Sequence, residues 1–317
     1  MNRSLSIKEY MDNVIDICID NKIGIYIYDT STNNDTQEYI NWLVRSKCCE
    51  DIIMYKRDNN YPDKTTDLKV LVGLEELKNL ADYVWLCGDG IVVDMMLCLR
   101  YIEDGINNKS EVIFFEYESD SHKKYIEKYD DCVSFFSEYG WSTTSYGATI
   151  VSSKLIDTKL QSKLYERYRN TGFLYWSSLF TELSNNEEND IYVVHTKYFH
   201  KNKHKNTNAS YGKGKFLKFW VENWLKAVYG LPAVYDGYKN KVAKDIGIKL
   251  HLYSVHNLIK LRGTHNLEKE QLDYYSAMLP LVTDVTYKQI RKYTYFPKWL
   301  AVSYMKIRML VASVMRK

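Results

Sequence analysis

The chain has 317 residues, of which 45% are hydrophobic and 26% are charged, and its formal net charge at pH 7 is +3. This composition is ordinary for a globular protein, and the length allows one large domain or two small ones. No run approaches ~20 uncharged apolar residues, which excludes a bilayer-spanning segment. The six cysteines form no C-x-x-C pair, so we expect reduced thiols rather than a disulfide framework or a cysteine metal site.

Short apolar runs rich in Ile, Val, Tyr and Phe predict strands at residues 23–28, 52–55, 83–87, 112–117, 149–152 and 191–194. Helical spacing of apolar residues predicts helices at residues 6–20, 36–47, 67–80, 92–103 and 121–139. Several strands are continuously apolar, as in a sheet that is covered on both faces. Strands that alternate with helices predict an α/β fold whose mostly parallel sheet is covered by helices.

The pattern changes after about residue 215, where no strand is predicted. The remaining apolar periodicity predicts helices at residues 216–229, 234–246, 250–261, 267–278 and 299–315. We therefore expect an α/β domain over residues 1–212 and a helical C-terminal region over residues 213–317.

The polar stretch DTSTNNDT (residues 29–36) comes directly after the first predicted strand. In an open parallel sheet, ligands bind beyond the carboxyl ends of the strands, where a carboxylate can accept hydrogen bonds from ribose hydroxyls or a base N–H. Asx turns and helix N-caps favour the same residue types, because short polar side chains hydrogen-bond to nearby backbone. Asp29 is therefore either a nucleoside-binding carboxylate or a turn residue.

The stretch YVWLCGDG (residues 83–90) ends another predicted strand at an aspartate between two glycines. Asp29 and Asp89 would then lie at the same edge of one sheet, which suits a nucleoside diphosphate. Asp29 would hold the nucleoside, and Asp89 would meet the diphosphate through a divalent cation. Mg²⁺ and Mn²⁺ prefer such oxygen ligands together with some retained water.

These stretches resemble motifs of the family 2 glycosyltransferases with the GT-A fold, especially enzymes of bacterial capsule and surface-polysaccharide synthesis. In that family a strand runs into an Asp-x-Ser stretch, matched at residues 29–36, and a Tyr-x-Trp-Leu segment leads into the DXD region, matched at residues 83–91. The segment FWVENWLKAVYGLPAVYDGYK (residues 219–239) is also similar to the tails of capsule glycosyltransferases. The resemblance implies a Rossmann-like GT-A fold and a nucleotide-sugar donor, usually a UDP-sugar, bound by Asp29, Ser31 and Asp89.

The sequence departs from the family pattern in three places. Gly90 and Ile91 stand where relatives carry further acids of the DXD region. The first strand of the family, with its base-supporting turn, is expected to be missing. The position of the acid that activates the acceptor hydroxyl reads Asn-Thr at residues 170–171. With Asp89, the nearby Glu166 and Glu182 are therefore the predicted catalytic residues, although a solvated helix face also explains each glutamate.

An acid-free segment covers residues 195–215 and contains six lysines and three histidines. It is either a solvated loop or a loop that closes over a diphosphate and neutralises the leaving group, with Lys213 among the donor-binding residues. Because many GT-A enzymes have a histidine ligand, the resemblance implies that His195 joins Asp89 in holding Mn²⁺ or Mg²⁺.

The segment FPKWLAVSYMKIRMLVASVMRK (residues 296–317) is apolar along one side and carries five basic residues. It predicts a helix that lies in an anionic membrane interface, with Trp299 and Tyr304 as anchors, or one that packs on its own domain or on a partner subunit in a homo-oligomer.

Together these features predict a glycosyltransferase that works in the cytoplasm, at the inner face of the cell membrane. It would move a sugar from a nucleotide-diphosphate donor to a lipid-linked or polysaccharide acceptor in cell-surface glycan synthesis. Two alternatives stay open at this point. One is a catalytically degenerate subunit that binds sugar nucleotides, and the other is a basic nucleic-acid-binding protein.

Overall fold

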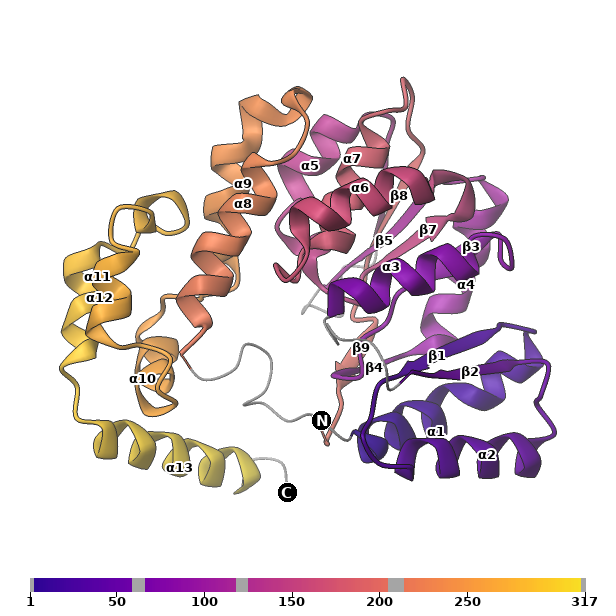
Figure 1. Cartoon of the computed structure of the whole chain (residues 1–317), viewed down its shortest axis with the longest axis horizontal. Helices are drawn as coiled ribbons and strands as arrows, with labels where there is room; N and C mark the ends of the chain where they lie inside the picture. Colours follow the sequence, from indigo (N-terminus) through magenta and orange to yellow (C-terminus); the bar gives the residue numbers. More distant parts are fainter. Residues whose placement is uncertain (1–2, 59–65, 118–124, 205–213, 315–317) are drawn as a thin grey trace. The chain divides into compact units, whose positions relative to one another are not determined.

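The computed structural model describes residues 3–58, 66–117, 125–204 and 214–314. The chain forms two compact units, which we describe separately (Figure 1). Unit 1 comprises Met1–Phe135, Ser142–Asn170 and Leu174–Asn206, and unit 2 comprises Phe136–Trp141, Thr171–Phe173 and Thr207–Lys317. Within the described ranges, no helix is long and apolar enough to cross a membrane.

Unit 1 begins with two helix–strand pairs. In chain order they are α1 (Ser4–Asp20), β1 (Ile25–Asp29), α2 (Asp35–Lys47) and β2 (Ile53–Arg57). The two strands pair in parallel, and both helices cover the same side of them (Figure 1). Met11 and Ile15 of α1 pack against Ile40 and Leu43 of α2 and against Ile53 of β2. Apolar residues three or four positions apart give each helix one such buried face.

A five-stranded sheet forms the centre of unit 1. In spatial order its strands are β3 (Tyr83–Trp85), β7 (Thr149–Ser152), β5 (Val112–Glu116), β8 (Ile191–His195) and β6 (Tyr125–Tyr129). Only β5 and β8 run parallel, and the other three neighbouring pairs are antiparallel. The α/β class is confirmed, whereas the prediction of a mostly parallel sheet is wrong for this sheet.

The error has a physical reason, because a continuously apolar run reports burial on both faces and not strand direction. β5, β7 and β8 are buried along almost their whole length. The predicted helix over residues 121–139 is also wrong in part. Residues 125–129 form β6, which is half exposed and pairs antiparallel with β8, and the helix α5 begins only at Cys132.

Further helices and a second two-stranded sheet complete unit 1. The helices are α3 (Thr66–Leu77), α4 (Met95–Asn107), α5 (Cys132–Tyr139), α6 (Thr158–Tyr168) and α7 (Leu174–Leu183), with single turns at Ser142–Thr144 and Ser153–Leu155. β4 (Ile91–Val93) pairs antiparallel with β9 (Phe199–Lys201). A helix was predicted from residue 92, but Val92 and Val93 pair with β9, and Asp94 caps α4 by accepting a hydrogen bond from the N–H of Leu97.

Every regular element between residues 214 and 314 is a helix or helical turn. They are a π-helical turn (Lys218–Asn223), α8 (Trp224–Tyr229), Ala233–Tyr235, α9 (Asp236–Lys249), α10 (Val255–Gly263), α11 (Lys269–Tyr274), Leu279–Leu281, α12 (Tyr287–Thr294) and α13 (Lys298–Val314). The helical character predicted for this region is confirmed. Gly247 of α9 approaches the backbone closely, since a Cβ there would lie 1.9 Å from the carbonyl oxygen of Val282.

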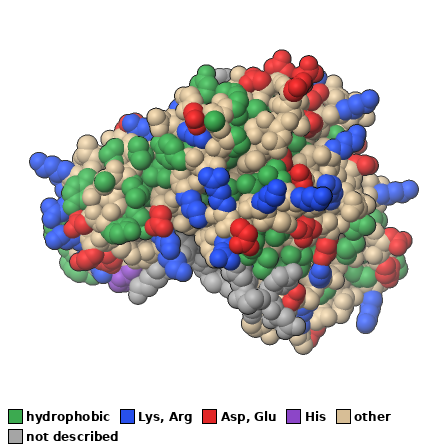
Figure 2. Space-filling view, turned by 45° about the horizontal axis from the view of Figure 1, so that its top comes forward, with side chains coloured by type: hydrophobic (Ala, Val, Ile, Leu, Met, Phe, Trp, Pro, Cys, Tyr) green, Lys and Arg blue, Asp and Glu red, His purple; other side chains and the backbone are tan. Residues whose placement is uncertain are grey.

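Both signs of charge share the face of the molecule drawn in Figure 2. Lys and Arg side chains project there among acidic side chains and patches of exposed hydrophobic ones.

Candidate functional site

Asp29 is the last residue of β1, and its carboxylate is buried. One oxygen, Oδ1, accepts a hydrogen bond from the backbone N–H of Ser31 at 2.7 Å, and Oδ2 accepts one from the Tyr55 hydroxyl at 2.7 Å. Burial alone would raise the pKa of Asp29, but bonds from Ser31 and Tyr55 and the charge of Arg57 outweigh burial and lower it. Asp29 therefore holds a buried negative charge at the carboxyl end of a parallel strand.

Arg57, at the end of β2, organises the loop that follows Asp29. The parallel register sets Arg57 beside Asp29. Its guanidinium donates hydrogen bonds to the Asn34 side chain at 2.6 Å, to the Gln37 side chain at 2.9 Å and to the carbonyl of Asn33 at 2.9 Å. Loop residues 31–34 are thus tied to the end of the neighbouring strand.

Tyr55 and Arg57 are not among the residues predicted from the sequence. The signal was present, because a polar YKR ending follows the apolar start of the second strand just as an aspartate ends the first. Neighbouring parallel strands bring such endings together at one edge. Ser31, a predicted donor-binding residue, donates hydrogen bonds from its backbone N–H and its hydroxyl to the Asp29 carboxylate, which makes it part of an Asx turn.

Asp89 lies in the turn between β3 and β4, and its carboxylate forms an ion pair with the guanidinium of Arg3. The side chains of Arg3 and Asp89 are 43% and 21% exposed, so the pair borders on solvent. The preceding residue, Gly88, is packed closely, since a Cβ there would lie 3.4 Å from Cβ of Tyr146.

The expectation that Asp29 and Asp89 follow strands of one sheet is wrong. β1 belongs to the two-stranded sheet and β3 to the five-stranded one, because no strand in the described ranges pairs with both. The two sites are nevertheless related through α1. Residues 21–24 join α1 to β1 by a short turn, so the helix and strand run antiparallel. The start of α1, with Arg3, and the end of β1, with Asp29, lie toward the same end of this layer (Figure 1).

His195 ends β8, where it is buried and stacks on the ring of Tyr125 at a centroid distance of 3.8 Å. Its Nε2 lies 3.6 Å from Oε2 of Glu127. Searched across the described ranges, His, Cys, Asp and Glu side chains form no group of three that could hold a metal ion. Among the described residues, no third such side chain joins Asp89 and His195 to complete the predicted Mn²⁺ or Mg²⁺ site, so the described donor set does not fit that cation.

The two glutamates predicted as catalytic have opposite surroundings. Glu182 on α7 is 6% exposed, whereas the Glu166 side chain on α6 is 71% exposed and lies 3.8 Å from Arg169. Oε1 of Glu182 accepts hydrogen bonds from the N–H of Asp157 at 2.9 Å and from the Gln161 amide at 3.1 Å. Burial raises the pKa of Glu182 to about 7, although both bonds favour the ionised form. These contacts make Glu182 a link between α6 and α7. Lys213 lies outside the described residues.

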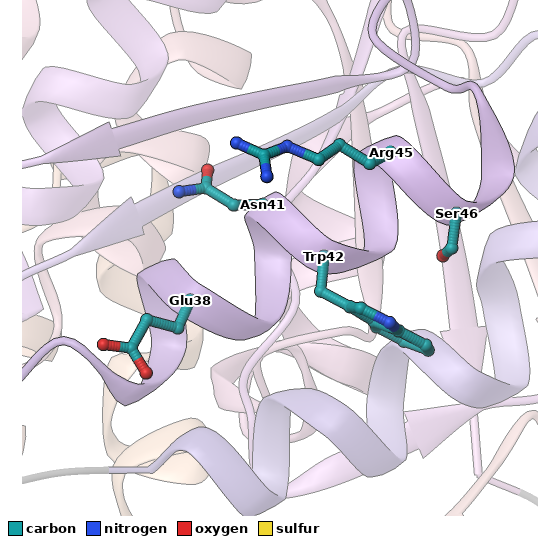
Figure 3. Close-up of a pocket in the computed structure, with 5 residues that line it drawn as sticks. All are labelled: Glu38, Asn41, Trp42, Arg45 and Ser46. Carbon is teal, nitrogen blue, oxygen red and sulfur yellow. The ribbon is translucent and has the colours of Figure 1, made fainter.

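An open pocket of about 500 Å³ lies on the surface of α2 (Figure 3). Its lining is Glu38, Asn41, Trp42, Arg45 and Ser46. Trp42 and Arg45 extend in different directions from the helix, and every lining residue comes from this one helix. The pocket contains none of the predicted site residues, and its side chains do not converge on a common point.

In unit 2, α13 exposes an apolar stripe. Trp299, Ile307, Leu310 and Val311 are all exposed. The opposite side packs on α10, where Ala301 and Met305 lie against Gly263. Tyr304, predicted as a membrane anchor, instead lies 3.1 Å from Nδ1 of His256 through its hydroxyl, at the edge of this packed side.

Cations border this stripe on both sides. With about 3.6 residues per turn, the exposed apolar side chains fall in one sector of the helix, between Lys306 and Arg308. Both of these side chains are exposed. Lys298 lies on the packed side, where it forms an ion pair with Glu268 at 2.8 Å.

No protein-family model matches the chain, and no curated protein does. Among solved structures, the crystal structure of S. aureus TarS residues 1–349 is similar, with a TM-score of 0.50 and 9% sequence identity over 90% of this chain and 87% of that chain. The structure of the same TarS segment in complex with UDP-GlcNAc gives a TM-score of 0.48 and 12% identity over 92% and 88% of the two chains. The chain thus shares the fold of this TarS segment.

Proposed function

We propose that the protein is a glycosyltransferase that moves a sugar from a nucleotide-diphosphate donor, a UDP-sugar, to a glycan or lipid-linked acceptor in cell-surface glycan synthesis. The GT-A, family 2 type fits its sequence motifs. The observation that carries the proposal is the buried, ionised Asp29 at the carboxyl end of β1, in a fold shared with TarS. Fold likeness alone would not suffice, since one fold hosts many activities.

The proposed chemistry assigns Asp29 to donor binding. The two oxygens of a carboxylate offer about four lone-pair directions, and the N–H and hydroxyl of Ser31 and the hydroxyl of Tyr55 occupy three of them. The remaining direction can accept a hydrogen bond from a ribose hydroxyl or a base N–H. In the transfer step the acceptor oxygen attacks the anomeric carbon, and the bonding pair of the breaking glycosyl–phosphate bond leaves with the diphosphate. The acceptor proton goes to a base, for which Glu182, with its pKa near 7, and Glu166 stay the predicted candidates.

A nucleotide panel tests this function. The melting temperature of the full chain should rise with one nucleoside diphosphate among UDP, GDP, CDP and TDP, because a ligand that binds only the folded state stabilises it, by about 2.7 kcal/mol at a hundredfold excess over Kd. A sugar nucleotide with the same base should then be hydrolysed slowly by the protein. No shift with any diphosphate contradicts the proposal, whereas a shift without turnover supports the degenerate-subunit alternative.

We propose further that the exposed stripe of α13 lies on an anionic lipid surface, at the cytoplasmic face of the membrane, where a lipid-linked acceptor would be found. Exposed apolar side chains bordered by Lys306 and Arg308 have the chemistry of a helix that lies in the headgroup region. A second copy of the chain, as in a homo-oligomer, is the competing occupant of this stripe.

Vesicle sedimentation checks this surface. Wild-type protein should sediment with phosphatidylglycerol-containing vesicles more than with phosphatidylcholine vesicles. Reversing both charges in Lys306→Glu/Arg308→Glu should weaken that binding at least about tenfold, since each cation near such a surface contributes roughly 1 kcal/mol. Ile307→Glu should weaken binding to both vesicle types. Tyr274→Glu, which changes an exposed aromatic residue of α11, is the control and should bind as wild type. Equal sedimentation of all variants, or a concentration-dependent dimer that Ile307→Glu abolishes, contradicts the membrane proposal.

A further inference from the structure

The carboxylate of Asp89 has a cationic partner, the guanidinium of Arg3. Asp89 stands between Gly88 and Gly90, and its carboxylate is paired with Arg3. A divalent cation would need several oxygen ligands at this place. The described residues offer one carboxylate, and a guanidinium is already bound to it.

The first part of the basic segment is tied to the same turn. The backbone N–H of Asn202 donates to the carbonyl of Gly90 at 3.2 Å, and its buried side chain donates to the carbonyl of Ser6 in α1 at 2.8 Å. The Ser6 hydroxyl in turn donates to the carbonyl of His204 at 3.3 Å. Lys203 and His204 are exposed beside this junction. The basic segment of residues 195–215 thus passes, at residues 202–204, beside the turn of Asp89 and the first turn of α1.

From these contacts we infer that Arg3 binds the donor diphosphate. It would do so at the place where the family that residues 83–91 resemble uses a divalent cation. This inference rests on the proposed function. A guanidinium carries five N–H donors in a planar fork that matches phosphate oxygens. One edge of Arg3 is held by Asp89, and its partly exposed side chain leaves other donors open to a ligand.

Asp89 then acts as a positioning residue. Its carboxylate fixes the guanidinium of Arg3, and the phosphate oxygens meet the donors that point away from Asp89. The first turn of α1, which follows Arg3, carries no acid, and the Glu9 carboxylate in the next turn accepts a hydrogen bond from the backbone N–H of Lys203 at 2.7 Å. Permanent cations can stabilise the negative charge that develops on a departing diphosphate.

The test compares nucleotides with and without a cation. Calorimetric titration of the full chain with UDP should give the same Kd within about twofold in EDTA and in 5 mM Mn²⁺ or Mg²⁺. Arg3→Ala should weaken UDP binding at least about tenfold and leave uridine binding within about twofold, because uridine has no phosphate. Arg3→Lys should fall between the two, since it keeps the charge and loses the fork. Arg100→Ala, which removes an exposed arginine of α4, is the matched control and should bind as wild type.

The two variants of the pair separate this inference from a metal site. Asp89→Asn should weaken UDP binding less than Arg3→Ala does, because it loosens the guanidinium without removing it. A metal held by Asp89 predicts the reverse order, with UDP binding dependent on Mn²⁺ and Arg3→Ala neutral or tighter. That outcome overturns the role of Arg3 and leaves the glycosyltransferase proposal intact. Absence of binding by UDP, GDP, CDP and TDP in either buffer overturns both.

Discussion

Replacing Asp29 with asparagine should weaken UDP binding at least about tenfold, and the protein should still fold. Hydrogen bonds to a charged group contribute roughly 1.5–3 kcal/mol, so losing the charge at a donor-binding carboxylate is costly. Asparagine keeps the shape and one carbonyl oxygen, which can still accept the N–H of Ser31. Titration calorimetry with UDP, paired with a thermal melt of each variant, measures the two effects separately.

Asp12→Asn is the matched control for this substitution. Asp12 also accepts a hydrogen bond from a tyrosine hydroxyl, that of Tyr39 at 3.0 Å, but it lies on the exposed face of α1. The Asp12→Asn variant should bind UDP as the wild type does. Because its surroundings lower the pKa of Asp29, the binding of uridine, which has no phosphate that titrates, should stay constant from pH 5 to pH 8. Unchanged affinity in Asp29→Asn would make Asp29 a turn residue only.

Glu182→Gln should change how the stability of unit 1 depends on pH. Burial raises the pKa of Glu182 from 4.5 to about 7, so folding favours the protonated form. The stability that this preference contributes is fully present below pH 4.5 and is lost as the pH rises to 7 and above. Each pKa unit corresponds to roughly 1.4 kcal/mol. Between pH 4.5 and pH 8, the free energy of unfolding of Glu182→Gln should therefore rise by about 3 kcal/mol relative to that of the wild type.

Urea unfolding of wild type and Glu182→Gln at several pH values measures this change. Glutamine retains an oxygen that can accept the hydrogen bonds from Asp157 and Gln161. Glu166→Gln makes the same chemical change on an exposed carboxylate, and its stability difference from wild type should stay constant over this range. A pH-independent difference for Glu182→Gln would show that its carboxylate is solvated. If Glu182 is also the catalytic base, the same variant will lose transfer activity while Glu166→Gln keeps it.

The sequence predicted the existence of most elements better than their arrangement. The strands ending at Asp29 and Ser152 and the helices of unit 2 follow directly from local apolar patterns. Strand direction in the central sheet did not, because β5, β7 and β8 are apolar on both faces whichever way their neighbours run. β6 was taken for helix because it is a short, half-exposed edge strand whose pattern covers only five residues.

Residues of the candidate site could be predicted where they belong to a sequence motif. They could not be predicted where a segment distant in the sequence contributes them. Asp29 and Asp89 were found from their positions at strand ends. Tyr55, Arg57 and Arg3 reach them only through the register of β1 with β2 and the path of α1. The difference between Glu166 and Glu182 likewise depends on burial, which the local sequence around a helical glutamate does not encode.

A crystal structure of the protein with UDP bound would show both proposed contacts at once. We expect the uracil or ribose to contact the Asp29 carboxylate and the diphosphate to contact the guanidinium of Arg3, which stays paired with Asp89. UDP bound elsewhere, for example against Trp42 on α2, or a diphosphate held through a metal ion on Asp89 with Arg3 turned away, would contradict this expectation.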